Sequence, residues 1–240
     1  MTDLRVRRGD GAGPAVLLLH GLGATSEVWD GVTAELAGVA WIAPDLPGHG
    51  GSAPLSAYTF AAMADAVAGL VDPAGTVVAG HSFGGVVGMH LAARPGIRAV
   101  VAVGVKVAWT AEELERAAAM AARPARTFPT REDALARHLR LAGLEGLVDP
   151  EAHAAGVVRD GDGWRPALDV RAFGVGDPGV AALLAAAPVP VVLARGEHDH
   201  MVGAADLRAL VPDPVELPGL GHNPHVEDPA AVARLLAPYR

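Results

Sequence analysis

With 240 residues, of which 51% are hydrophobic, the chain is long enough to bury a full core and too apolar to be disordered. Its 19 basic and 27 acidic residues give a net charge of −8, which argues against a nucleic-acid partner because phosphate binding needs clustered Lys and Arg. The lack of cysteine excludes disulfides and a cysteine nucleophile, and residues 1–14 have no signal-like apolar stretch, so we expect a cytoplasmic protein with no membrane partner.

Short apolar runs recur along the chain and predict buried strands. They lack the polar alternation of half-exposed strands, as is typical of a parallel sheet. The runs are AVLLLH (15–20), AWIAPD (40–45), TVVAG (76–80), AVVAVG (99–104), PVVLARG (190–196) and PVELPG (214–219). Helices are predicted between them at 26–38, 60–71, 83–94, 203–211 and 228–238. This alternation predicts an α/β fold, a mostly parallel sheet with helices on both faces.

The alternation stops between residues 105 and 187. This region is helical by composition and then rich in loops, and we expect no strand in it. Ligands of open α/β sheets bind at the carboxyl ends of the strands, where such an insertion would act as a lid. We therefore expect a core formed by residues 1–104 and 188–240, and a helical lid or cap insertion at 105–187.

A serine stands at the corner between one strand and the next helix. Residues 80–84, GHSFG, fit the pattern G-x-S-x-G directly after a strand and at the start of a helix. On this tight turn the Ser82 hydroxyl projects from the edge of the sheet, and the Phe83 amide lies at a helix N-terminus that favours an anion. The same letters also fit an ordinary serine N-cap after a Gly-rich turn, so a catalytic interpretation requires partner residues.

A serine hydroxyl needs a base to take its proton and an acid to orient that base. Asp199 follows a late strand, and His222 follows the last strand, so both loops emerge at the same edge as Ser82. A second amide for the oxyanion is expected in the loop HGLG (20–23), where the Leu22 N–H is our candidate.

The histidines around this acid and base also allow a metal site. The set comprises His198, Asp199, His200, His222 and His225. We favour the triad and expect no metal and no cofactor, because the triad accounts for the same residues and neighbours on an extended segment point apart. Asp45 and Glu197 are alternative acids; Asp45 is interpreted as part of a structural turn. His20, His49 and His81 are expected to brace backbone.

Five segments in order, HGLG, DLPGHGGS (45–52), GHSFGG, RGEHD and GLGHNPHVEDP, resemble the α/β-hydrolase fold superfamily. The resemblance covers the chain outside the expected lid and implies Ser82 as nucleophile, Asp199 as acid and His222 as base, with the Leu22 and Phe83 amides as the oxyanion hole. The N-terminus is short for a member, so the leading strands must be reduced to LRVRRGDG.

The resemblance implies a cofactor-free serine hydrolase of a small-to-medium carboxylic ester or lactone, a small molecule with an apolar portion. A C–C bond hydrolase, a non-hydrolytic cyclase or lyase, and a ligand-binding protein that retains the triad stay open. Dehalogenase and epoxide-hydrolase chemistry is excluded, since those members carry a carboxylate at the serine position. The architecture also leads us to expect an apolar substrate pocket, with candidates Trp109, Phe128, Trp164, Phe173 and Met201.

Overall fold

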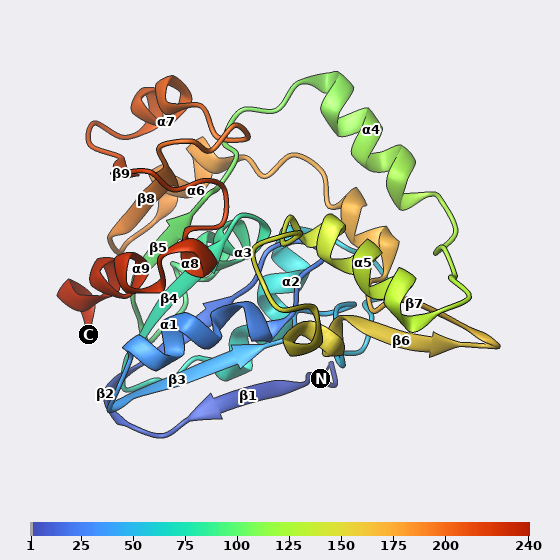
Figure 1. The fold of residues 1–240 in the computed structure, drawn as a ribbon. Coiled ribbons are helices and arrows are strands. Elements are labelled where there is room, and N and C mark those ends of the chain that lie inside the picture. Colours follow the sequence, from blue (N-terminus) through green and yellow to red (C-terminus); the bar gives the residue numbers. More distant parts are fainter. Residues whose placement is uncertain (1) are drawn as a thin grey trace.

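The computed structural model describes residues 2–240, and its centre is a seven-stranded sheet in the order β1-β3-β2-β4-β5-β8-β9 (Figure 1). Only β1 runs antiparallel to its neighbour, so the predicted, mostly parallel α/β sheet is confirmed. The strands of this sheet are β1 (Val6–Gly9), β2 (Ala12–Leu19), β3 (Val39–Pro44), β4 (Thr76–His81), β5 (Ile97–Val103), β8 (Val191–Gly196) and β9 (Val215–Leu217). The shortened leading strand expected in LRVRRGDG is β1.

Helices and helical turns connect the strands, close to the predicted ranges. The α-helices are α1 (Asp30–Glu35), α2 (Phe60–Val67), α3 (Phe83–Leu91), α4 (Ala111–Ala121), α5 (Arg131–Ala142), α6 (Val180–Ala186), α7 (Ala204–Leu210), α8 (Pro224–Glu227) and α9 (Pro229–Leu236). The 3₁₀ turns are η1 (Ser26–Trp29), η2 (Ala68–Leu70), η3 (Pro150–Gly156), η4 (Val170–Gly174) and η5 (Ala237–Tyr239). No helix within residues 2–240 is both long and apolar enough to cross a bilayer.

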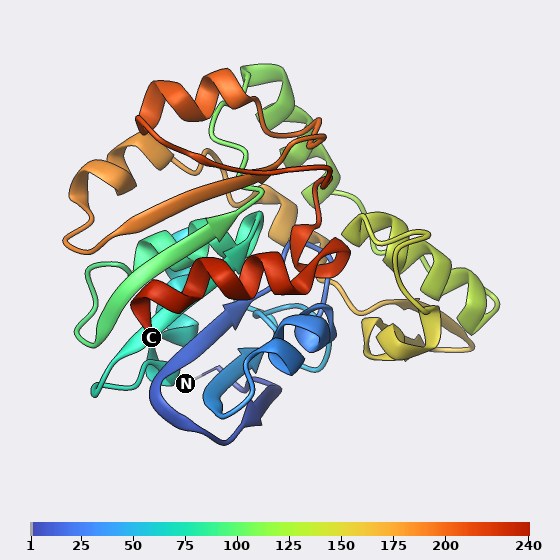
Figure 2. The same cartoon turned by 60° about the vertical axis from the view of Figure 1, so that its left-hand side comes forward.

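The central strands are buried on both faces because helices cover both sides of the sheet. Alternate side chains point to opposite faces, so Val78 of β4 faces one core and Val77 the other. The first core packs the sheet against α2, α3, α6 and α7, and the second packs it against η1, α1 and α9. Figures 1 and 2 show α1 and α9 together on one face, with α2 and α3 behind the sheet. Every residue of β4, the strand that ends beside Ser82, is buried. Packing on both faces therefore holds the end of this strand in place.

The segment 105–187, which we call the cap segment, leaves the end of β5 and returns to β8, the neighbouring strand of the sheet. It contains α4, α5, η3, η4 and α6, as its helical composition predicts. It also contains a hairpin of β6 (Val157–Asp160) and β7 (Gly163–Pro166), and the expectation of no strand in this region was therefore wrong. Each strand of the hairpin has only four residues, and the hairpin is stabilised by packing on α5. This packing could not be predicted from the sequence of the hairpin. Figure 2 shows α5 and the β6–β7 hairpin beyond the carboxyl ends of the strands, whereas α6 packs against the sheet beside α3.

Two glycines allow the turn between β4 and α3. A Cβ on Gly80 would lie 2.4 Å from the carbonyl oxygen of Gly84, and a Cβ on Gly84 would lie 2.2 Å from that of Leu19. Real Cβ atoms do not approach backbone this closely, and backbone cannot move aside as a flexible side chain can. Glycine is therefore required here for space, so that α3 can begin directly against the ends of β2 and β4.

We predict that Gly84→Ala destabilises the protein by about 3 kcal/mol, at the upper end of the usual effect of overpacking. The measurement is the free energy of unfolding in urea. The matched control is Gly69→Ala: a Cβ on Gly69 meets no atom within 4 Å, so that variant should stay within about 1 kcal/mol of the wild type. Equal stability of the two variants would contradict the close approach.

Candidate active site

Ser82 occupies a strained corner at the end of β4. Its φ of 47° and ψ of −111° make it the one non-glycine residue with positive φ among residues 2–240. Such a conformation costs on the order of 1–3 kcal/mol and persists only where surrounding structure enforces it. The Ser82 side chain makes no capping hydrogen bond to α3, so the interpretation of this serine as an ordinary N-cap is wrong. The hydroxyl is therefore not used to stabilise the helix that it precedes.

Asp199 and His222 are brought together by the loops that follow β8 and β9. Asp199 Oδ2 lies 2.9 Å from His222 Nδ1, the Asp199 side chain is fully buried, and 13% of the His222 side chain is exposed. The second carboxylate oxygen, Oδ1, accepts a hydrogen bond of 2.8 Å from the Met201 amide. Because the carboxylate can only accept, His222 Nδ1 carries the proton, and its Nε2 is left as the acceptor. This is the tautomer that a general base requires.

The loop that carries His222 lies against the corner that carries Ser82. His81, the residue before Ser82, has its Nε2 2.8 Å from the carbonyl oxygen of His222, and the two rings are 4.9 Å apart between centroids. Burial lowers the pKa of His81 well below its usual value, so the ring is neutral and donates this bond through Nε2–H. No hydrogen bond joins Ser82 Oγ to the His222 ring in the described chain. In free enzymes such contacts are often long and tighten when substrate binds.

Two backbone amides near Ser82 have no protein acceptor. Neither the Leu22 N–H nor the Phe83 N–H donates a hydrogen bond within residues 2–240. Phe83 opens α3, where the first amides have no partner in the helix and the helix dipole favours negative charge. Leu22 lies in the loop after β2, and His20 fixes that loop: its Nδ1–H donates to the Gly21 carbonyl at 2.8 Å, while its Nε2 accepts from the Leu46 amide.

Arg195 braces the loop that carries Asp199, a role that was not predicted from the sequence. This buried side chain donates to the carbonyl oxygens of Asp199 and Glu197, each at 3.0 Å, and to that of Val202 at 2.9 Å. Its remaining nitrogen pairs with Glu216 at 2.7 Å. An arginine inside the apolar run PVVLARG was the available signal, because a buried cation requires several acceptors. The alternative acid Glu197 is exposed and accepts from the Gly219 amide instead.

Glu227 holds the loop that carries His222, a second role that was not predicted from the sequence. Its Oε2 accepts from the Gly221 amide at 2.5 Å and its Oε1 from the Asn223 amide at 2.9 Å. One carboxylate thus binds the backbone on both sides of His222. Asn223 in turn donates through Nδ2 to the carbonyl oxygen of Gly143, at the end of α5 in the cap segment. The position of the His222 imidazole therefore depends on Glu227, which forms no hydrogen bond with the ring itself.

We predict that Glu227→Ala lowers kcat by about 10²-fold with a smaller change in KM, because a shift of about 1 Å in a catalytic group has an effect of that size. Glu227→Gln keeps one acceptor oxygen and should retain an intermediate kcat. Steady-state kinetics on a 4-nitrophenyl ester measure both, with the exposed Glu145→Ala as control. A loss confined to KM, or equal losses in the alanine and glutamine variants, would contradict a positioning role.

Asp45 is structural, as its sequence context indicates. It is fully buried, pairs with Arg5 at 3.0 Å and accepts the amides of Ser26 and Gly51 at 2.8 and 3.0 Å. These contacts use both carboxylate oxygens to hold the turn 45–52, so Asp45 does not orient a base. His49 in the same turn has Nδ1 3.1 Å from the Pro47 carbonyl, in line with its expected bracing role.

Two fully buried histidines, His49 and His225, are held neutral. Burial is the main cause that lowers the pKa of each to about 3, and neighbouring histidines add to it. An unfolded histidine has a pKa of about 6.5. Below pH 6.5 these two histidines bind a proton in the unfolded chain but stay neutral in the folded protein. The free energy of unfolding that is present above pH 6.5 therefore decreases as the pH falls.

We therefore predict that the free energy of unfolding decreases between pH 7 and pH 5 by about 2 kcal/mol for each of these two histidines. Urea denaturation at several pH values measures it. His198→Gln, which alters an exposed ring, should keep the wild-type pH dependence, whereas His49→Gln should reduce the decrease by about 2 kcal/mol and leave the contribution of His225. An unfolding free energy that is the same at pH 7 and pH 5 would contradict this prediction.

The histidines considered for a metal site do not converge. His198 and His200 are exposed on either side of Asp199, whereas His225 is buried between Trp29 and His81. Within residues 2–240, no three His, Cys, Asp or Glu side chains lie close enough together to hold a metal ion.

The residues predicted to line the substrate pocket lie in several places. Phe128 and Trp164 pair through their backbones and pack with Leu135 in a small apolar cluster inside the cap segment. Trp109 is 37% exposed beneath the Lys106 ammonium, and Met201, beside the acid, is 44% exposed. Phe173 packs against the core that contains Phe83 and also lines a cavity of about 230 Å³ between α5 and η4. Their contact with substrate stays a prediction.

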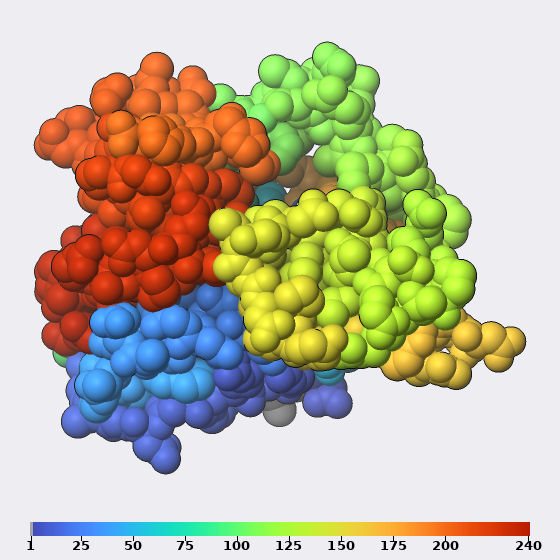
Figure 3. Space-filling model, in the orientation of Figure 1, coloured from blue at the N-terminus to red at the C-terminus, as the bar shows by residue number. Residues whose placement is uncertain are grey.

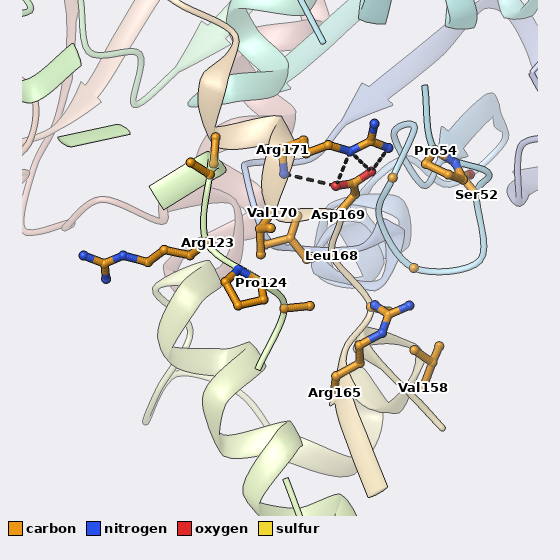
Figure 4. A pocket seen from close by; sticks show the side chains of 16 residues that line it. Ser52, Pro54, Arg123, Pro124, Val158, Arg165, Leu168, Asp169, Val170 and Arg171 are labelled. Carbon is orange, nitrogen blue, oxygen red and sulfur yellow. Dashed lines mark hydrogen bonds and ion pairs between the residues drawn. The ribbon is translucent and has the colours of Figure 1, made fainter. Parts of the chain in front are cut away.

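Figure 3 shows a hollow between the α4 segment, the α5 segment and the C-terminal part of the chain. A cavity of about 690 Å³, larger than the one that Phe173 lines, lies between the turn 48–54, the segment after α4, and η4. Figure 4 shows this larger cavity from close by. Ser82, Asp199 and His222 do not line this larger cavity. In its lining Arg171 is ion-paired with Asp169 at 2.5 Å, whereas Arg123, which also lines it, forms no ion pair within residues 2–240.

The sheet order, the strained serine and the Asp199–His222 pair define a protein of the hydrolase class with the α/β fold. The Alpha/beta hydrolase family matches residues 16–235, nearly the whole chain, and the protein belongs to this family. The resemblance seen in the sequence is thereby confirmed.

Several known proteins are similar to the chain. Lipase LipV of Mycobacterium tuberculosis is 36% identical in an alignment of 180 positions that covers 69% of this chain and 67% of LipV. The 2-succinyl-6-hydroxy-2,4-cyclohexadiene-1-carboxylate synthase of Enterobacter sp. is 28% identical and is matched over 97% of this chain and 94% of its own length. Among solved structures, E-2-(acetamidomethylene)succinate hydrolase superposes with a TM-score of 0.79 at 26% identity, covering 98% of this chain and 94% of that one. An uncharacterized Mycobacterium bovis protein is 46% identical, but only over 26% of its length.

Proposed function

We propose that the protein is a serine hydrolase that cleaves a small-to-medium carboxylic ester or lactone through an acyl-enzyme intermediate. The observation that carries the proposal is the 2.9 Å bond between Asp199 and His222, beside a serine held at positive φ with no capping role. The family and the presence of a lipase among its relatives support the same reaction type. A cytoplasmic location and a lid role for the cap segment are part of this proposal.

In the proposed reaction, Ser82 Oγ attacks the carbonyl carbon while His222 Nε2 takes its proton. Asp199 holds the imidazole in the required tautomer and stabilises its charged form. The negative charge that develops on the carbonyl oxygen is bound by the Leu22 and Phe83 amides, which have no acceptor in the protein. His222 then gives the proton to the leaving alcohol, and a water molecule that His222 activates releases the acid and restores Ser82. Ser82, His222, Asp199 and the two amides supply every group that this reaction needs, so it requires no cofactor.

A turnover screen tests this function. Esters of 4-nitrophenol with acyl chains of two to twelve carbons and lactones of several ring sizes are the substrates, and a fluorophosphonate probe reports the nucleophile. We expect turnover of at least one series and labelling of Ser82 alone. A folded protein that neither labels nor turns over would overturn the proposal and favour a ligand-binding role for the pocket.

A second function is favoured by one observation: the relative matched along almost its whole length is named a synthase, not a hydrolase. On the same scaffold, His222 could take a proton from a carbon acid instead of from Ser82, followed by elimination. A lyase of this kind would leave esters untouched while the fluorophosphonate still labels Ser82, and the two readouts together therefore separate the two functions. The same turnover screen also tests C–C bond hydrolysis by including a vinylogous diketone among the substrates.

A further inference from the structure

Three arginines without counterions line one cavity within the cap segment. Most cationic side chains in the described chain form ion pairs, but Arg123, Arg126 and Arg137 form neither an ion pair nor a hydrogen bond within residues 2–240. All three line the 230 Å³ cavity between the segment after α4, helix α5 and η4, in a protein whose net charge is −8. Unpaired like charges around one cavity repel each other, and an anion bound between them would remove that repulsion.

The cavity adjoins the loop assigned to the oxyanion hole. Leu141 of α5 lines the cavity, and a Cβ on Gly23, next to Leu22, would lie 3.4 Å from the Leu141 Cβ. Phe173, on another wall, packs against the core that also contains Phe83. Leu141 therefore contacts both the cavity that the arginines line and the loop that presents the Leu22 amide.

The lining combines cations with apolar side chains. Leu141, Leu168, Val170 and Phe173 offer contact for a chain of methylene groups, while guanidinium groups bind carboxylates and phosphates through paired hydrogen bonds. Arg137 is half-buried on α5, Arg123 and Arg126 are exposed, and Arg126 lies over the Phe128 ring, 4.8 Å from its centroid. Figure 4 shows the Arg123 side chain extending away from the Asp169–Arg171 pair of the larger cavity.

We propose that this arginine cavity, formed around Arg123, Arg126 and Arg137, binds an anionic oxyacid group of the substrate while the ester lies at Ser82. The substrate class is an ester with an apolar chain that ends in a carboxylate or a phosphate, such as a half-ester of a dicarboxylic acid. This inference rests on the proposed function for the reaction at Ser82, but the binding of the anion is independent of that reaction.

The kinetic test compares 4-nitrophenyl half-esters of dicarboxylic acids with 4-nitrophenyl alkanoates of equal chain length. The ratio of their kcat/KM values is expected to favour the anionic series at one chain length, and to fall by about tenfold or more in Arg137→Met and Arg123→Met, as for loss of a charged hydrogen bond. Arg208→Met is the matched control, because Arg208 is an exposed, unpaired arginine on α7 outside the cavity. An unchanged ratio in the two cavity variants would overturn the proposal.

A binding test separates the arginine cavity from the chemistry. Calorimetry on the Ser82→Ala protein uses glutarate, butyl phosphate and neutral glutaramide as probes. Saturable binding of glutarate or of butyl phosphate, weakened in Arg137→Met but not in Arg208→Met, supports the cavity and distinguishes a carboxylate from a phosphate. Absence of binding by both anions, or equal binding of glutaramide, overturns it. If the anions bind while no ester is hydrolysed, the proposed function fails and the arginine cavity stands.

Discussion

Ser82→Ala is expected to lower kcat for a 4-nitrophenyl ester by about 10⁶-fold, the usual effect of removing a serine nucleophile. The loss should appear in kcat, since alanine removes only the attacking oxygen. The fold should persist, because the Ser82 hydroxyl makes no hydrogen bond to α3 and alanine has the same backbone preferences at this corner.

A stability measurement accompanies the kinetics. Ser82→Gly should be about as inactive as Ser82→Ala but more stable than it by about 1 kcal/mol, because glycine adopts φ of 47° without strain. Urea denaturation of the two variants measures the difference. Turnover within tenfold of wild type in either variant would remove Ser82 from the chemistry, and a glycine variant less stable than the alanine variant would show that the corner is not strained.

The positions of the strands along the chain were accessible from sequence because each buried strand is a short apolar run with a turn at its end, whereas their order in the sheet was not predicted. The runs at 76–80 and 99–104 correspond to β4 and β5 within a few residues. The hairpin β6–β7 was not accessible in this way. Arg159 and Trp164 face each other across it and its tip is DGDG, so its strands carry neither an apolar run nor regular alternation. Its stability comes from packing on α5, which is a tertiary effect.

The candidate triad could be named from sequence for a similar reason. Parallel strands end at one edge, so polar residues that follow β4, β8 and β9 had to come close together. The supporting residues could not be found in the same way. Arg195 and Glu227 act by hydrogen bonding to backbone carbonyls and amides of loops. A sequence motif does not indicate which backbone groups of a loop need a side-chain partner. Unpaired arginines around a cavity are equally invisible before the fold brings Arg123 and Arg137 together.

Asp199→Asn is expected to lower kcat by about 10⁴-fold without unfolding the protein, as known for the acid of other serine triads. The structure gives the reason. Asp199 Oδ1 accepts the Met201 amide, and Oδ2 accepts the proton on His222 Nδ1. In the asparagine variant the single carbonyl oxygen accepts the hydrogen bond from the Met201 N–H. The opposite orientation would place the side-chain NH₂ group against the Met201 N–H, and two donors cannot bind each other.

The asparagine NH₂ group then points at His222 Nδ1 and donates to it. His222 is forced into the tautomer with its proton on Nε2, where it cannot accept the proton of Ser82. Steady-state kinetics measure the loss, and an unfolding free energy close to wild type shows that the fold is kept. Glu197→Gln is the matched control: Glu197 lies two residues away, is exposed and touches only the Gly219 amide, so its loss should change kcat by less than about threefold, as for a surface substitution. A large loss in Glu197→Gln together with full activity in Asp199→Asn would reassign the acid, because the tautomer of the base follows whichever carboxylate faces Nδ1.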